Sequence, residues 1–148
     1  MRLTCAAVSK NPGLRLKALS AGLTDVGRKR NHNEDSYLID EDLQLYVVAD
    51  GMGGHAGGGT ASRIAVETID AELRGAKKRS DDPFSGETPL QDSPLPEFLR
   101  GAVEKACANI FKAAQEDPRL AGMGTTAIAL CVKGENARIC SISSPKSS

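Results

Sequence analysis

The sequence predicts an α+β fold in which antiparallel strands carry two helices on one face. Apolar residues alternate in short runs separated by tight polar turns, which is typical of antiparallel hairpins. Two longer segments between these runs repeat their apolar residues at helical spacing instead. With 148 residues, the chain is long enough for one domain with a core of its own, and two full domains are not expected.

The first strands are predicted on either side of a polar loop. Residues 19–26 form a short mixed run, and residues 36–40 hold an apolar one. Residues 41–42 predict a turn, after which apolar side chains alternate and close a strand that ends at Asp50. The simplest arrangement is an antiparallel pair of strands joined by this turn.

A glycine-rich stretch precedes the first helix. Residues 51–59 include six glycines, which predicts a turned loop because glycine loses the most backbone entropy when it folds into a helix or strand. Thr60 is placed to cap the helix that follows, and Gly75 is placed to end it. Residues 77–94 show no periodicity and predict a solvated connection.

The second helix and a second hairpin complete the predicted elements. The helix is expected over residues 95–116, since Pro118 prevents its continuation. Residues 125–132 predict a strand, and residues 137–142 predict the strand that returns after a turn.

These elements predict a domain over residues 19–142. Residues 1–18 are expected to be a flexible lead-in, because an Asn-Pro-Gly sequence interrupts them before an apolar segment can form. Residues 143–148 are expected to be an aberrant Ser-rich tail that cannot continue a core strand.

Composition and charge narrow the classes of function. Nineteen basic residues balance nineteen acidic ones, so no net charge would attract nucleic acid or an anionic membrane. No apolar run approaches the roughly 18 residues that a membrane helix requires. The four cysteines are scattered without a C-x-x-C pair, which favours a reducing, cytoplasmic setting.

Acidic residues stand at both ends of the first predicted hairpin. Glu34 and Asp35 precede it, and Asp50 and Gly51 follow it. Since antiparallel strands bring the start of one beside the end of the next, these carboxylates should converge and would repel one another without a cation. Mg²⁺ or Mn²⁺ fits carboxylate and carbonyl oxygens better than zinc does, because no His or Cys converges there. Arg30 could pair its guanidinium with phosphate oxygens, so the set points to phosphoryl transfer to water.

Three motifs occur in order along the chain. The first consists of Thr24-Asp25-Val26-Gly27, Arg30 and Asn33-Glu34-Asp35-Ser36, the second is Val48-Ala49-Asp50-Gly51-Met52-Gly53-Gly54-His55, and the third is Gly122-Met123-Gly124-Thr125-Thr126-Ala127. Together they resemble the metal-dependent protein serine/threonine phosphatases of the PPM (PP2C-type) family, and the bacterial branch most. The resemblance covers roughly residues 21–137. It implies the N-terminal part of an αββα sandwich and a hydrolase for phosphoserine and phosphothreonine in proteins, which would oppose a cognate Ser/Thr kinase.

The resemblance also implies roles for single residues. Asp50 would bridge two Mn²⁺ or Mg²⁺ ions, and the Gly51 carbonyl would ligate one of them. Glu34 and Asp35 would hold metal-bound waters, and Arg30 would bind the substrate phosphate while a water activated by the metals attacks phosphorus.

The sequence departs from the family pattern after the last predicted strand. A Gly-Asp-Ser-Arg segment and two later metal-ligating aspartates are expected there, and the chain has Ser-Ser-Pro-Lys-Ser-Ser instead. We therefore expect a truncated phosphatase domain that is inactive or folds poorly.

Other interpretations of the same residues stay open. A phosphatase-like module could bind phosphoprotein or metal without turnover. The glycines after Asp50 also follow a strand and open a helix, as in dinucleotide-binding folds. Arg30 could be an exposed loop residue, as could His32, whereas His55 could donate a proton to a leaving oxygen.

Overall fold

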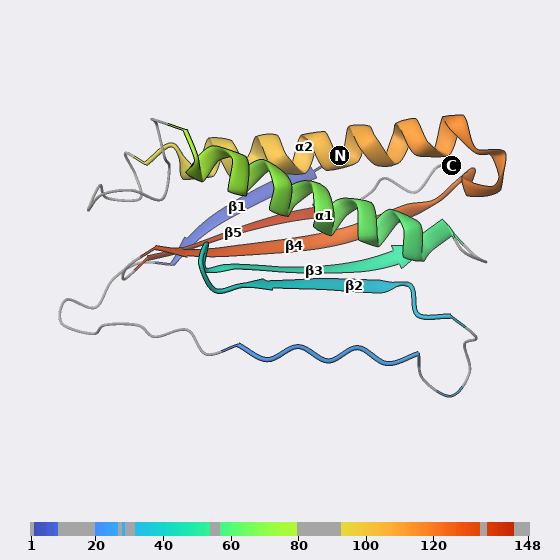
Figure 1. Ribbon diagram of the computed structural model, residues 1–148, viewed down its shortest axis with the longest axis horizontal. Coiled ribbons are helices and arrows are strands. Elements are labelled where there is room, and N and C mark those ends of the chain that lie inside the picture. Colours follow the sequence, from blue (N-terminus) through green and yellow to red (C-terminus); the bar gives the residue numbers. More distant parts are fainter. Residues whose placement is uncertain are drawn as a thin grey trace.

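The computed structural model describes residues 2–8, 20–26, 28, 32–53, 57–79, 93–133 and 136–143. Its five strands form one sheet in the order β1-β5-β4-β3-β2 (Figure 1). The elements are β1 (Arg2–Val8), β2 (Asp35–Asp40), β3 (Leu45–Met52), α1 (Gly57–Lys77), α2 (Leu95–Glu116), the 3-10 turn η1 (Pro118–Leu120), β4 (Gly124–Lys133) and β5 (Asn136–Ser143).

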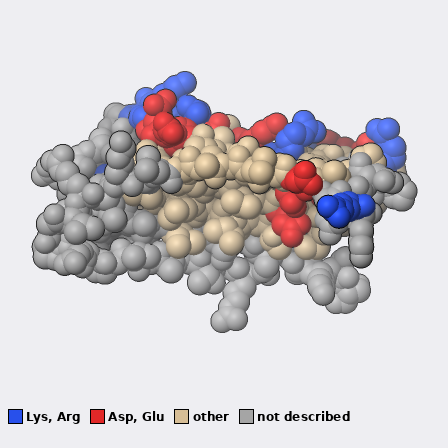
Figure 2. Space-filling model, turned by 90° about the horizontal axis from the view of Figure 1, so that it is seen from below, with Lys and Arg blue, Asp and Glu red and all other residues tan. Residues whose placement is uncertain are grey.

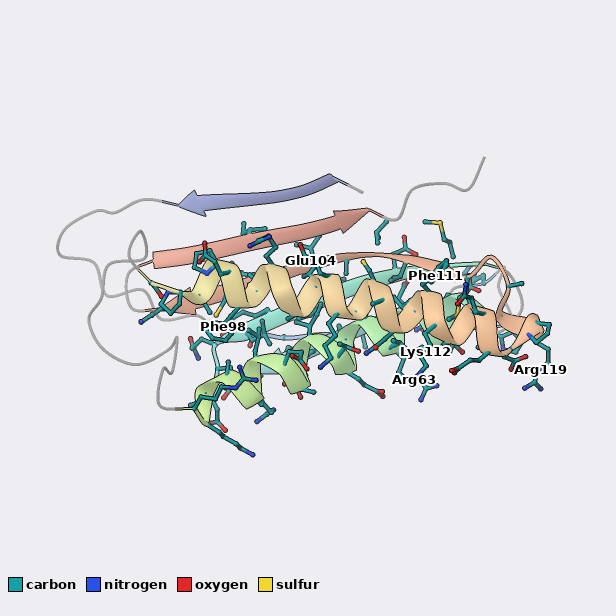
Figure 3. All side chains as sticks on the ribbon, turned by 90° about the horizontal axis from the view of Figure 1, so that it is seen from above. Arg63, Phe98, Glu104, Phe111, Lys112 and Arg119 are labelled. Atoms are coloured by element: carbon teal, nitrogen blue, oxygen red, sulfur yellow. The ribbon has the colours of Figure 1, made fainter. Side chains whose placement is uncertain are left out.

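Both helices cover the same face of the sheet, as the sequence predicts. Figure 1 shows α1 and α2 above the strands, and Figure 3 shows the two helices side by side over the sheet. Lys105 Nζ lies 2.5 Å from Glu72 Oε1, and Asn109 Nδ2 donates to Thr68 Oγ1 over 3.1 Å, so polar contacts join the helices along their outer surface. We call the helix-covered face of the sheet its inner face and the opposite one its outer face.

The core lies between the inner face and one stripe of each helix. Alternate residues of β3 and β4 point inward because side chains alternate along a strand. The main buried residues are Leu45, Val47, Ala49, Ala127, Ala129, Cys131, Ala65, Ile69, Leu73, Leu95, Leu99, Val103 and Ala106. Small alanines on the strands let the helices lie close, which compensates for the shortage of aromatic residues.

Every strand pair in the sheet is antiparallel. The chain leaves β3, forms α1 and then α2, and only afterwards returns as β4, next to β3. A dinucleotide-binding unit requires a helix that leads directly into a parallel strand. The topology therefore overturns the dinucleotide-binding alternative.

The first helix begins earlier and ends later than the sequence predicts. Gly57, Gly58 and Gly59 form its first turn, so the predicted cap at Thr60 is wrong, and the helix passes Gly75 to end at Lys77. Glycine costs helix stability, but a Cβ at Gly58 would lie 2.7 Å from Glu34 Oε1 and 2.9 Å from the Gly51 carbonyl carbon. Close packing against neighbouring backbone, rather than a turn, explains glycine at this position.

The remaining elements fall close to their predicted bounds, with two exceptions near the N-terminus. The second helix and both predicted hairpins are confirmed. Residues 20–26 were expected in a strand but lie outside the sheet, because no described strand forms a ladder with them. Within the expected lead-in, β1 forms and pairs with β5. Residues 80–92 and 144–148 lie outside the described part of the chain.

Among the described residues, no helix combines the length and the apolar character needed to cross a membrane.

Candidate metal centre

The register of the first hairpin places two carboxylates opposite each other. Asp35 is the first residue of β2 and pairs directly with Asp50 of β3. Directly opposed residues of an antiparallel pair have their Cβ atoms only about 5 Å apart, and like charges there destabilise the sheet. Both aspartates lie at the exposed end of the hairpin, on the outer face. A cation between them would relieve this repulsion.

The loop that enters β2 is organised by Asn33. Its side-chain oxygen accepts a hydrogen bond from the Asp35 backbone N–H at 3.0 Å. Its side-chain nitrogen donates to Thr24 Oγ1 over 2.7 Å. One amide thus holds residues 20–26 to the start of β2 and sets the backbone beneath Asp35, a role that the sequence analysis did not assign to Asn33.

Glu34 lies on the other side of this backbone. Because successive side chains point in opposite directions, Glu34 turns toward the helix layer while Asp35 turns outward. Its Oε1 packs against Gly58, where an added Cβ would come within 2.7 Å. The N-terminal end of a helix carries partial positive charge, so this position favours a carboxylate. The structure therefore brings Asp35 and Asp50 together and places the Glu34 side chain beside the first turn of α1.

Gly51 is held where only glycine fits. Its N–H donates to the Glu34 carbonyl over 3.1 Å. A Cβ at this position would lie 2.1 Å from the Gly58 carbonyl oxygen and 2.4 Å from the Glu34 carbonyl oxygen. The sequence predicts a turned loop from Gly51 onward; the structure places Gly51 in β3, where the neighbouring backbone leaves no room for a side chain.

The donor set suits a hard divalent cation that keeps much of its water. Two facing carboxylates and a backbone carbonyl are oxygen ligands of the kind that Mg²⁺ takes, usually with several waters retained. In the part of the chain that the structure describes, no group of three His, Cys, Asp or Glu residues is placed to hold a metal ion. The described residues therefore fit part of a magnesium or manganese site.

The other candidate residues separate into three cases. Arg30 and His55 lie outside the described residues. His32 is exposed in the loop before β2. The Cys131 thiol is no candidate nucleophile, because burial in the core raises its pKa to about 12.

A groove leads away from the two aspartates along the outer face. It has a volume of about 560 Å³ and runs between residues 20–24 and the outer side of β2, β3 and β4, with Asp35 and Asp50 among its lining residues. Figure 2 shows this face as a stretch of uncharged atoms with acidic side chains towards its ends. The candidate metal ligands therefore sit at the border of an apolar surface.

A family model described as protein phosphatase 2C matches residues 26–143. The serine/threonine phosphatase stp of Listeria monocytogenes is 35% identical over 109 residues, which cover 72% of this chain and 39% of that protein. The chain thus spans about two fifths of that relative.

Solved structures show the same likeness. The Mycobacterium tuberculosis serine/threonine phosphatase PstP/Ppp aligns with a TM-score of 0.61 and 28% identity over 95% of this chain and 46% of that one. A structure of the PstP catalytic domain in complex with two manganese ions aligns with a TM-score of 0.54 and 30% identity, over 89% of this chain and 44% of that one.

Proposed function

Because the chain belongs to the protein phosphatase 2C family, we propose that its site hydrolyses phosphoserine and phosphothreonine esters of proteins with the aid of Mn²⁺ or Mg²⁺. The observation that carries the proposal is the direct pairing of Asp35 with Asp50, beside a Gly51 backbone that tolerates no side chain. Relatives named as serine/threonine phosphatases support the substrate class, and the manganese complex of a similar structure supports the metal.

Each residue of the proposed site has a separate task. Asp50 and the Gly51 carbonyl would hold the metal, while Asp35 and Glu34 would accept hydrogen bonds from water around it. When bound, the divalent ions supply charge that stabilises the transferring phosphoryl group and an activated water to attack it. Arg30 would hold the substrate phosphate by paired N–H donors, so that phosphorus faces the attacking water.

We expect these 148 residues by themselves to bind metal weakly and to turn over slowly. In the described residues two carboxylates face one another, and a site that retains several waters gains little affinity from so few ligands. Phosphoryl transfer in a two-metal site depends on charge stabilisation at both the attacking and the leaving oxygen, so weak metal binding should slow turnover.

The test is release of phosphate from a phosphothreonine peptide with Mn²⁺ added, in the wild type and in Asp50→Asn. We expect slow release or none from the wild type, and at least a tenfold lower rate in Asp50→Asn wherever release is detectable, because the amide lacks the ligating charge. Equal release by both proteins would contradict the proposed role of Asp50.

A second candidate function is a phosphatase-like module that binds phosphoprotein without turnover. The small number of facing carboxylates in the described residues favours it. Binding of the phosphothreonine peptide that requires Mn²⁺ but releases no phosphate would support this function, whereas release that depends on Asp50 would exclude it.

The proposed partners are phosphorylated proteins and the serine/threonine kinase that modifies them. The bacterial relatives are named as serine/threonine phosphatases, which indicates their substrate class but no kinase. The kinase partner is therefore a part of this proposal. We place the reaction in the cytoplasm; the free thiols of Cys107 and Cys131 are compatible with a reducing compartment.

A further inference from the structure

Thr125 is a buried polar residue that the proposed site does not yet use. It lies near the start of β4 and is only 4% exposed. A buried hydroxyl needs a hydrogen-bond partner, because leaving it unpaired costs free energy. The Thr125 Oγ1 lies 2.9 Å from the Asp50 carbonyl oxygen and 2.8 Å from the Thr126 carbonyl oxygen, so its single proton is shared between two acceptors.

The first of these acceptors belongs to the peptide group that joins Asp50 to Gly51. Thr125 pairs with Gly51 in the register of β3 and β4, which places its hydroxyl beside this peptide. The N–H of the same peptide donates to the Glu34 carbonyl from the entry to β2, over 3.1 Å. The Asp50–Gly51 peptide is therefore held at its oxygen from one neighbouring strand and at its nitrogen from the other side.

Such support matters because glycine restricts its own backbone less than any other residue. No residue with a side chain could replace Gly51 to restrict this freedom, because its Cβ would lie 2.1 Å from the Gly58 carbonyl oxygen. The backbone torsions on either side of this peptide set the direction of the Gly51 carbonyl relative to the Asp50 carboxylate. The Thr125 hydroxyl, together with the β3–β4 ladder, therefore restrains the orientation of the two groups.

We propose that Thr125 is a positioning residue, whose hydroxyl orients the Asp50–Gly51 peptide so that both groups face one metal ion; this inference rests on the metal site of the proposed function. Groups that orient metal ligands commonly change metal affinity by roughly 10- to 100-fold when they are removed. Thr125 touches neither substrate nor metal in this role and acts through the backbone of its neighbour.

The experiment compares Thr125→Val, which keeps the shape and loses the hydroxyl, with Thr125→Ser, which keeps the hydroxyl. Binding of Mn²⁺ to the full chain is measured by the loss of the free-ion electron paramagnetic resonance signal. We expect Thr125→Val to bind at least about tenfold more weakly than the wild type and Thr125→Ser to bind within about threefold of it.

A metal-free readout separates orientation from general stability. Amide hydrogen exchange at Gly51, followed by NMR, should become faster in Thr125→Val because the peptide loses the hydrogen bond from the Thr125 hydroxyl. Thr68→Val is the matched control: it removes a hydroxyl that bonds Asn109 over 3.1 Å in the helix layer. This control should change neither Mn²⁺ affinity nor Gly51 exchange beyond its effect on global unfolding.

The outcomes distinguish this inference from the proposed function. Wild-type affinity in Thr125→Val, together with loss of binding in Asp50→Asn, would overturn the positioning role and leave the metal site standing. No Mn²⁺ uptake by the wild type would overturn both. Should Thr125→Val fail to fold, Thr125→Cys keeps a weaker donor of similar size and should show intermediate affinity; wild-type affinity there would also overturn the role.

Discussion

At the scale of single residues, glycines decide how closely three backbone segments approach. Gly51, Gly58 and Gly59 lie where the entry to β2, the end of β3 and the start of α1 meet. A Cβ at Gly59 would lie 3.3 Å from the Asn33 carbonyl oxygen, and the other two positions are tighter still. The candidate ligands are held together because these residues have no side chain.

Replacement of Gly58 by alanine tests this packing. The new Cβ would lie 2.7 Å from Glu34 Oε1 and 2.9 Å from the Gly51 carbonyl carbon, of which only the first can move aside. We expect the free energy of unfolding to fall by about 1–3 kcal/mol, as for other overpacked positions. Urea unfolding followed by circular dichroism measures the change.

Gly75→Ala provides the matched control on the same helix. Nothing lies within 4 Å of a Cβ at Gly75. Because alanine is the better helix former, this variant should gain up to about 1 kcal/mol. Equal effects of the two substitutions would show that helix propensity, and not backbone contact, governs Gly58.

At the scale of elements, one end of α1 is fastened to the β2–β3 turn. Asp40 Oδ1 accepts hydrogen bonds from the backbone N–H groups of Asp42 and Leu43, which closes the turn. Its Oδ2 accepts no well-aligned hydrogen bond but lies 2.5 Å from Arg74 Nη2, so that contact is chiefly electrostatic. Lys77 Nζ donates to the Asp42 carbonyl over 2.9 Å. The register that pairs Asp35 with Asp50 begins at this turn.

Replacement of Arg74 by methionine tests this attachment. The Asp40 side chain is 2% exposed, so loss of Arg74 would leave a buried carboxylate without its cation. Arg74 is itself half exposed, which weakens the pair through solvent screening, and we expect a loss of about 1–3 kcal/mol in the free energy of unfolding. Chemical denaturation at neutral pH measures it.

Arg100→Met is the comparison for Arg74→Met. Arg100 pairs with Glu104 on α2 at 3.5 Å, and both side chains are more than half exposed. Its loss should cost less than about 0.5 kcal/mol, as for other exposed helix pairs. If both arginines prove equally dispensable, the turn does not depend on α1.

At the scale of the whole molecule, the two faces of the sheet are covered differently: both helices lie over the inner face, whereas in the described part of the chain residues 20–24 border a groove on the outer face. The helices bury the inner face, whereas Tyr37, Val48 and Ile128 on the outer face are 43%, 61% and 53% exposed. The buried Tyr46 hydroxyl beside them has no hydrogen-bond partner among the described residues. Exposed apolar surface of this kind promotes association.

The double variant Val48→Thr/Ile128→Thr should therefore associate less than the wild type. Both changes keep the β-branched shape that strands favour while removing apolar surface. Light scattering at increasing protein concentration should show smaller particles in the variant. Phe111→Thr is the control, because Phe111 is 66% exposed but lies singly on α2, on the side away from α1 (Figure 3).

The sequence by itself determined the type and order of most elements. Apolar periodicity located both helices and the paired strands, because burial on one face requires a period of two in strands and about 3.6 in helices. The sequence also predicted that the two ends of the first hairpin meet, but a turn at residues 41–42 would pair Asp40 with Leu43. The structure turns over residues 41–44 and pairs Asp40 with Leu45, and this register places Asp35 opposite Asp50. The order and spacing of the motifs indicated the family from the sequence alone.

Only the tertiary structure decided how far α1 extends, where Glu34 points and what holds the Asp50–Gly51 peptide. Each depends on contacts between residues far apart in the chain: Gly58 with Glu34, and Thr125 with Asp50. Local propensity places glycine in a loop, but close packing of backbone outweighs that preference at Gly58. The sequence of one strand does not show which strand lies next to it. The role of Thr125 therefore depends on the pairing of β4 with β3, which only the structure shows.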